Sequence, residues 1–191
     1  MCGKWRLAIV VFVCFVVFLP NTAIQATQNS DPFLLEQWYL NEISAQDFSG
    51  HEQDETIVAI LDAGFDLDHE DLKNQYWKNT KEIAGNNKDD DNNGFDDDVY
   101  GWDFVDSDSD PSPVIGKKIN DTVASHGTLL SGIIAASTNN GIGIAGITSN
   151  TKIMPLRIVD ENGVGTTTDV KSAIKYAVEN GADVINLSFT S

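Results

Sequence analysis

The sequence predicts an α/β protein with three layers, in which helices cover both faces of a mostly parallel sheet. The first observation is three continuous apolar runs of strand length, at residues 56–61, 152–159 and 182–187. Strands that are buried on both faces have this composition. The second observation is a helical pattern between the last two runs, with apolar residues at helical spacing from Thr167 to Asn180. Strand, helix and strand in this order predict a parallel crossover unit.

The ends of the predicted elements also carry signals. Thr167, Thr168 or Asp169 can cap the start of the helix, and Gly181 suits its C-terminal exit. Upstream of the first strand, residues 33–48 are mixed and aromatic. We expect them to form an N-terminal arm that packs on the domain through Trp38 and Leu40.

Residues 1–26 predict a secretory signal peptide. A basic start is followed by an apolar run from Leu7 to Leu19, and Ala26 is a small residue suited to cleavage. The run is shorter than the roughly 20 residues that cross a bilayer, so no membrane span is predicted. Both cysteines, Cys2 and Cys14, lie in this segment. The mature chain, secreted to an extracellular or periplasmic space, would therefore lack disulfides, for which bound metal is the usual substitute.

Charge narrows the classes of partner. The chain has 12 Lys and Arg against 29 Asp and Glu, a formal net charge of −17, which argues against nucleic acid or anionic membrane as a partner. Residues 27–191 fit one domain. Within it, residues 86–110 contain ten aspartates and one lysine. An acidic run of this kind either stays disordered or binds cations.

Two residues predict acid–base chemistry. Asp62 ends the first apolar strand, so its carboxylate should lie at the carboxyl edge of the sheet, where open α/β folds place their sites. His126 opens a helix of small residues 64 positions later. Asp followed by His is the order found in one kind of Ser-His-Asp triad. Alternatively, Asp62 is a turn or capping residue, or the nucleophile of a phosphatase. A phosphatase would need a second aspartate at the position of Gly64.

The acidic run contains a pattern typical of calcium loops. Alternate oxygen ligands and a glycine for the sharp turn match positions 1, 3, 5, 6, 7 (through the main-chain carbonyl) and 9 of that pattern: Asp89, Asp91, Asn93, Gly94, Phe95 and Asp97. Tyr100 stands where the bidentate glutamate belongs, so Asp98 or Asp103 is a candidate for the missing ligand. The alternative is a solvated acidic loop.

Three separated stretches, in order, resemble the subtilisin-like serine proteases (subtilases, peptidase S8). They are residues 58–72, Ser125-His126-Gly127-Thr128 with Ser131-Gly132, and Gly181 to Ser188. The resemblance covers the chain from about Trp38 onward. It implies that Asp62 orients His126 and that His126 is the general base. It also implies that an extended substrate lies between two segments, Gly163-Val164-Gly165 and Ser188-Phe189-Thr190. By the same likeness Asp71 and the 139–140 loop belong to another calcium site.

The resemblance matches the N-terminal part of the catalytic domain, so we expect a subtilisin-like fold truncated before its C-terminal half. The oxyanion asparagine and the nucleophilic serine would lie further on, and none of Ser125, Ser131 and Ser188 has a nucleophile context. A complete version would be a secreted, calcium-stabilised serine endopeptidase acting on peptides or proteins. The residues given should be inactive alone. The alternative is a non-catalytic secreted pseudoprotease that binds calcium or a partner.

Overall fold

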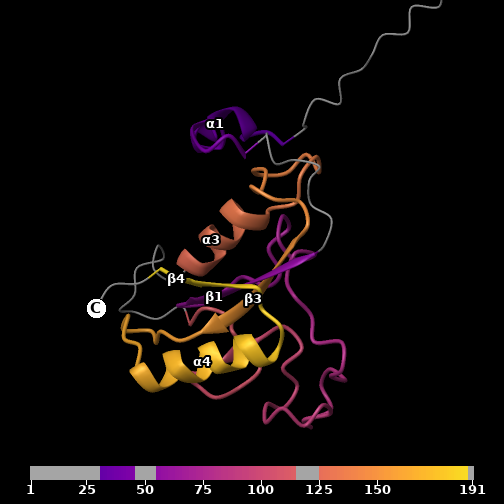
Figure 1. The fold of residues 1–191 in the computed structure, drawn as a ribbon, viewed down its shortest axis with the longest axis vertical. Coiled ribbons are helices and arrows are strands. Elements are labelled where there is room, and N and C mark those ends of the chain that lie inside the picture. The colour runs from indigo at the N-terminus through magenta and orange to yellow at the C-terminus, as the bar shows by residue number, and fades with distance from the viewer. Residues whose placement is uncertain (1–30, 46–54, 115–124, 189–191) are drawn as a thin grey trace, which may run out of the picture.

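The computed structural model describes residues 31–45, 55–114 and 125–188. Its centre is a four-stranded sheet with the order β2-β3-β1-β4, in which all three pairings are parallel (Figure 1). The strands are β1 (Thr56–Asp62), β2 (Trp102–Asp103), β3 (Thr151–Arg157) and β4 (Val184–Leu187). The three predicted apolar runs are therefore confirmed as strands. The predicted signal peptide, Phe189 and Thr190 lie outside the described residues.

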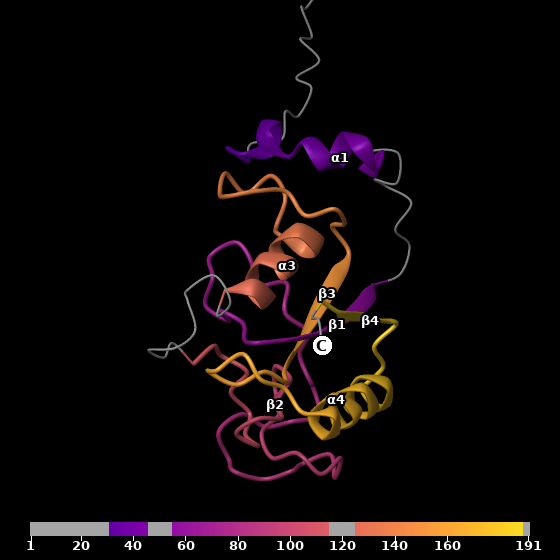
Figure 2. The same cartoon turned by 90° about the vertical axis from the view of Figure 1, so that its left-hand side faces the viewer.

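Two helices cover opposite faces of the sheet, as Figures 1 and 2 show together. α3 (His126–Ala135) packs on one face, where Ala135 and the partly buried Leu130 and Ile134 join the core around Ile60, Phe65 and Ile153. α4 (Thr167–Glu179) lies on the other face with Leu61, Trp102 and Leu156. The fold is thus a three-layer α/β subtilisin-like fold, as predicted.

The ends of α4 correct one prediction and confirm another. The N-cap residue is Thr166, whose side-chain oxygen accepts a hydrogen bond from the backbone N–H of Asp169, so none of Thr167, Thr168 and Asp169 is the cap. At the other end Gly181 has a φ of +82°. The N–H of Ala182 donates to the Ala177 carbonyl and that of Gly181 to Val178. This pair of bonds is the Schellman ending, which favours glycine because of its left-handed backbone.

Polar contacts at Gln37 hold the N-terminal arm. The predicted packing of Trp38 is wrong, whereas Leu40 is partly buried. The arm contains a 3-10 turn, η1 (Leu34–Glu36), and α1 (Trp38–Glu42). Trp38 is 72% exposed and does not anchor the arm. Instead the buried Gln37 amide donates to the Ala145 carbonyl and accepts from the Ala145 N–H, at 2.7 and 2.8 Å. A paired amide can replace apolar burial here because both of its polar groups are satisfied.

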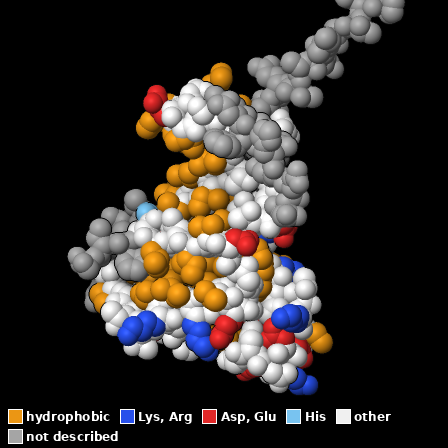
Figure 3. Space-filling view, viewed as in Figure 1, with side chains coloured by type: hydrophobic (Ala, Val, Ile, Leu, Met, Phe, Trp, Pro, Cys, Tyr) orange, Lys and Arg blue, Asp and Glu red, His pale blue; other side chains and the backbone are white. Residues whose placement is uncertain are grey.

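Apolar side chains are exposed along β4. Val184 and Leu187 are 50% and 44% exposed, and β4 pairs with β1 on one side only within the described sheet. Figure 3 shows hydrophobic side chains gathered on this face between the positions of α3 and α4. Among the described residues, no helix combines the length and apolar character needed to cross a membrane.

Candidate active site

The fold brings Asp62 and His126 into contact. Asp62 is the last residue of β1 and His126 the first of α3. The Nδ1 of His126 lies 2.7 Å from Asp62 Oδ2, and the backbone N–H of Ala63 donates to Asp62 Oδ1 at 2.8 Å. The Asp62 side chain is 5% exposed and that of His126 41%. The Asp62 carboxylate is buried, and each of its oxygens makes a hydrogen bond. It holds Nδ1 of His126, which leaves Nε2 as the ring nitrogen available for proton transfer.

Small residues make this contact possible. The buried face of α3 consists of Gly127, Ser131, Gly132 and Ala135. A Cβ atom on Gly127 would lie 2.5 Å from the Gly64 carbonyl oxygen and 3.1 Å from Asp62 Cβ. The helix therefore approaches the end of β1 at a distance that only glycine allows at this position.

A buried ion pair lies beside the dyad. Arg157 ends β3 directly opposite Asp62 in the strand register, and the Ile158 N–H donates to the Asp62 carbonyl at 2.9 Å. The Arg157 side chain is 1% exposed and its Nη1 donates to Asp103 and, at 2.6 Å, to Asp106. Asp103 is therefore engaged by arginine, and it is not among the carboxylates that converge in the Asp-rich segment. Burial raises the pKa of Asp103, while the hydrogen bond from Arg157 opposes that rise.

The first predicted substrate segment is a turn after β3. The N–H of Asp160 donates to the Val164 carbonyl, and the Asp160 carboxylate accepts from the N–H groups of Asn162 and Val164, each at 2.8 Å. A hydrogen bond from the Asn162 side chain, then one from the Val164 N–H, lowers the pKa of Asp160. Gly163 has a φ of +79° and Val164 is 59% exposed. Ser188, in the second predicted segment, directly follows β4.

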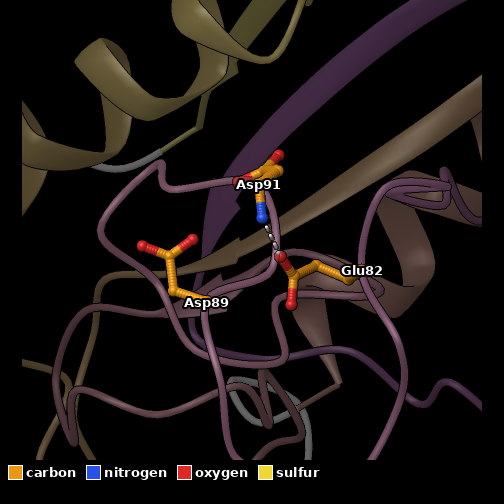
Figure 4. A group of neighbouring side chains, drawn as sticks. All are labelled: Glu82, Asp89 and Asp91. Atoms are coloured by element: carbon orange, nitrogen blue, oxygen red, sulfur yellow. Dashed lines mark hydrogen bonds between the residues drawn. The ribbon is translucent and has the colours of Figure 1, made fainter.

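Three carboxylates converge in the Asp-rich segment (Figure 4). One oxygen from each of Glu82, Asp89 and Asp91 lies within 4.8 Å of the others. Glu82 Oε1 accepts from the N–H groups of Asp90 and Asp91, whereas Oε2 is buried without a hydrogen-bond partner. Burial raises the pKa of Glu82. Hard oxygen ligands gathered around an unsatisfied carboxylate oxygen fit a calcium ion.

The other predicted loop ligands make hydrogen bonds within the loop, and the backbone N–H of Asn93 donates to Oδ1 of both Asp89 and Asp91, at 3.0 and 3.1 Å. Asp97 accepts from the N–H groups of Asn86 and Asn87 at 3.1 and 2.7 Å, and so closes the base of the loop. The side-chain oxygen of Asn93 accepts from the Phe95 N–H, and its amide donates to Asp98. Asp98 is fully buried and also accepts from Tyr176 at 2.6 Å. The Phe95 ring packs against Trp102, Phe104 and Tyr176.

Asp71 lies at a second polar cluster, under the 139–145 loop. Its Oδ1 accepts from the Asn140 amide at 2.7 Å and its Oδ2 from the Ile144 N–H at 3.3 Å. The buried Asp31 accepts from the N–H groups of Asn139 and Asn140. The structure therefore brings Asp71 and Asn140 together, as predicted, and adds Asp31 and the Gln37–Ala145 pair nearby.

Comparison with known proteins agrees with this arrangement. The subtilase family profile (Peptidase S8) matches residues 53–191, and the chain belongs to this family. "Subtilisin-like protease 1" of Plasmodium falciparum (isolate 3D7) is 35% identical over 167 residues, which cover 84% of this chain and 23% of that protein. "Halolysin-like extracellular serine protease Nep" of Natrialba magadii is 31% identical over 161 residues, covering 83% and 25%. The chain thus spans about a quarter of the length of these curated relatives.

A solved structure supports the same assignment. A protease from Pseudoalteromonas arctica PAMC 21717 superimposes with a TM-score of 0.60 at 27% sequence identity, over 84% of this chain and 50% of that one. This likeness agrees with the α/β subtilisin fold derived above.

Sequence reasoning missed several residues of these sites. Glu82 lies outside the calcium-loop pattern, and a single glutamate before an acidic run gives little signal. Arg157 could have been noticed, because an arginine inside an apolar strand must find a carboxylate when it is buried. Gln37 and Asp31 carry no pattern that distinguishes them from surface residues, and only the tertiary contacts reveal their burial.

Proposed function

We propose that this chain supplies the aspartate and histidine of a serine endopeptidase. The observation that carries the proposal is the 2.7 Å contact between Asp62 Oδ2 and His126 Nδ1 in a subtilase fold. Asp62 fixes the imidazole with its proton on Nδ1, so that the unprotonated Nε2 serves as the base.

In the proposed reaction a serine from outside the described residues attacks the carbonyl carbon of a peptide bond. The Nε2 of His126 takes the proton from the serine hydroxyl as the new C–O bond forms. The same proton then passes to the leaving amine when the C–N bond breaks. The buried Asp62 carboxylate stabilises the imidazolium that exists between these two transfers.

The proposed substrates are proteins or peptides bound in extended form. The exposed turn at Gly163-Val164-Gly165 and the segment Ser188-Phe189-Thr190 would provide backbone partners on the two sides of the substrate. We further propose that the protein is secreted. The predicted signal peptide supports secretion, and one relative of the chain is described as an extracellular serine protease.

The test is peptidase activity of the gene product that carries these residues. Asp62→Ala and His126→Ala should each lower kcat by several orders of magnitude, since the triad acts as a unit. Glu179→Ala is the matched control. It removes an exposed charge from α4 and should leave kcat unchanged. Retained activity in either dyad variant would overturn the proposal. A folded wild-type protein without activity would favour the non-catalytic calcium- or partner-binding role.

We also propose that Glu82, Asp89 and Asp91 hold a calcium ion. A bound Ca²⁺ would supply positive charge among three carboxylates and a ligand for the unpaired Glu82 Oε2. Asn93, Phe95 and Asp97 would then shape the loop, or join the ion after rearrangement. The ion would tie residue 82 to the 89–91 segment, which supplies rigidity in a chain whose only cysteines are Cys2 and Cys14.

Calorimetry and melting curves test the calcium site. Calcium should release or absorb heat on binding and raise the Tm, and chelation should reverse both. Glu82→Gln should weaken binding at least tenfold. Asp96→Asn removes the same charge from an exposed position of the same loop and should alter binding only slightly. The absence of heat, with an unchanged Tm after chelation, would remove the site.

Asp71 with Asn140 is the proposed second calcium site. Here the Asp71 oxygens already accept hydrogen bonds from other residues of the protein. Calcium binding would therefore require these hydrogen bonds to break. The calorimetric stoichiometry distinguishes the two arrangements: two ions per chain support both sites, and Asp71→Asn should then remove one of them.

A further inference from the structure

We infer that Asp160 is a positioning residue for substrate binding, because it fixes the turn at Gly163-Val164-Gly165 and so holds one side of the proposed substrate site in place relative to the dyad. The inference rests on the proposed function, which assigns an extended substrate to this turn. Asp160 itself belongs neither to the dyad nor to the proposed substrate segments or metal sites.

Five hydrogen bonds tie the turn to this one residue. The Asp160 N–H donates to the Val164 carbonyl at 2.9 Å, and the Asp160 carbonyl accepts from the Gly163 N–H at 3.0 Å. Its Oδ1 accepts from the N–H groups of Asn162 and Val164, each at 2.8 Å, and its Oδ2 accepts from the Asn162 side-chain amide at 3.1 Å. The carboxylate makes three of these five bonds, so the conformation of the turn depends on the Asp160 side chain as well as on its backbone.

The hydrogen bonds leave alternate residues of the turn open. Both backbone polar groups of Val164 are bonded to Asp160. Within the described residues, by contrast, the Gly163 carbonyl and the backbone groups of Gly165 have no hydrogen-bond partner. Hydrogen-bonded residues alternate in this way along a strand that pairs antiparallel with a neighbour. Asp160 therefore determines which backbone groups the turn offers to an extended substrate.

The turn also has a fixed place relative to Asp62. The Ile158 N–H donates to the Asp62 carbonyl at 2.9 Å. Gly165 lies against the carbonyl of the same residue, because a Cβ atom on Gly165 would be 2.7 Å from the Ile158 oxygen. Ile158 is fully buried, so it links the dyad to the turn through backbone that cannot shift freely. A turn held by Asp160 thus presents its open groups at a set distance from His126.

Side-chain packing contributes little to the shape of this turn. Residues 161–165 are all exposed, and two of them are glycines. Without the carboxylate the glycines would let the turn adopt other conformations, and substrate binding would then have to order it. Ordering a segment on binding lowers affinity but leaves the chemical step unchanged. The loss should therefore appear as a higher KM at an unchanged kcat.

The test compares Asp160→Ala, Asp160→Asn and Glu161→Ala in the active gene product. Asparagine keeps an oxygen that can accept from the Val164 N–H, so it should restore part of the loss. Glu161→Ala is the matched control. It removes the neighbouring exposed carboxylate, which accepts from the Asn162 side chain at 3.4 Å and makes no bond to the backbone of the turn among the described residues.

Each variant is assayed on two substrates. One is a peptide with several residues on both sides of the cleaved bond, and the other is a single-residue ester, which is too short to extend along the turn. We expect Asp160→Ala to raise KM for the peptide about tenfold, and to change kcat and the KM for the ester less than about twofold. Asp160→Asn should give an intermediate KM, and Glu161→Ala should match the wild type.

Three outcomes would overturn the inference. They are a peptide KM in Asp160→Ala equal to that of Glu161→Ala, an equal rise in KM for both substrates, and a fall in kcat without a rise in KM. A failure of the proposed function is distinguishable from these, because wild-type activity of His126→Ala on the ester would show that the proposed dyad is wrong.

Discussion

Replacing Arg157 by methionine should strongly destabilise the protein. Methionine keeps the apolar stem of the arginine but removes the charge that faces Asp103. The Asp103 side chain is 2% exposed; its Oδ1 keeps the N–H groups of Val105 and Asp106, while Oδ2 loses its arginine partner. Leaving a buried charge unpaired costs about 3–5 kcal/mol. Asp106 is 54% exposed, so its lost ion pair should add less than about 1 kcal/mol.

Urea unfolding at pH 7 measures this cost as a lower midpoint at an unchanged slope. Asp106→Asn is the control and should cost less than about 1 kcal/mol, because it removes only the exposed partner. A loss below about 1 kcal/mol in Arg157→Met would show that water reaches Asp103, and would refute the reasoning from burial.

The pH dependence of the Arg157→Met deficit gives an independent check. Burial raises the folded-state pKa of Asp103 above its unfolded value of about 3.9. A raised pKa means that the folded protein binds the proton more tightly, so the contribution of Asp103 is most favourable below the unfolded pKa and is lost as the pH rises through the folded one. Without Arg157 the folded pKa should rise further. The deficit of the variant should therefore be largest at neutral pH and smaller near pH 4; an equal deficit at both would contradict this account.

Two further predictions concern the surroundings of the dyad. Gly127→Ala should lower the free energy of unfolding by about 1–3 kcal/mol through overpacking and weaken the Asp62–His126 contact. Gly132→Ala on the same helix should be tolerated, because its Cβ would meet only Ile144, at 3.6 Å. Equal melting temperatures of the two variants would contradict this prediction. The lowered pKa of Asp160 means that its stabilisation of the turn is present above its unfolded pKa and is lost as the pH falls through the folded one. Hydrogen-exchange protection of the Val164 N–H should therefore fall on acidification, and Asp160→Asn should remove that pH dependence.

The sequence predicted β1, β3, β4 and α4 because these elements depend on local signals, whereas the pairing of Asp62 with His126 was implied by the resemblance to the subtilases. Apolar runs define buried strands, and the carboxyl edge of a parallel sheet places Asp62. The same signals could not identify Gln37 as the anchor of the N-terminal arm. An aromatic residue such as Trp38 is the usual expectation for burial, but a fully paired amide replaced it.

The carboxylates of the proposed calcium site were also predicted only in part. Asp89 and Asp91 follow the spacing of a calcium loop, and the structure brings them together. Glu82 comes from outside the loop, and its position depends on how residues 79–98 fold over the aromatic cluster around Phe95. Spacing along the chain cannot encode such a contact. The Thr166 cap was missed by one residue, which is within the usual uncertainty of helix ends.

The order of the strands has a consequence for synthesis on the ribosome. β1 is made first, and its partners β3 and β4 are not made until about 90 residues or more have followed it. At 5–20 residues per second, the apolar run of β1 waits roughly 5–20 s before its first neighbour has been translated. During that time its unpaired edges are exposed to other nascent chains. Chaperones that bind extended apolar segments would be expected to act on this part of the chain first.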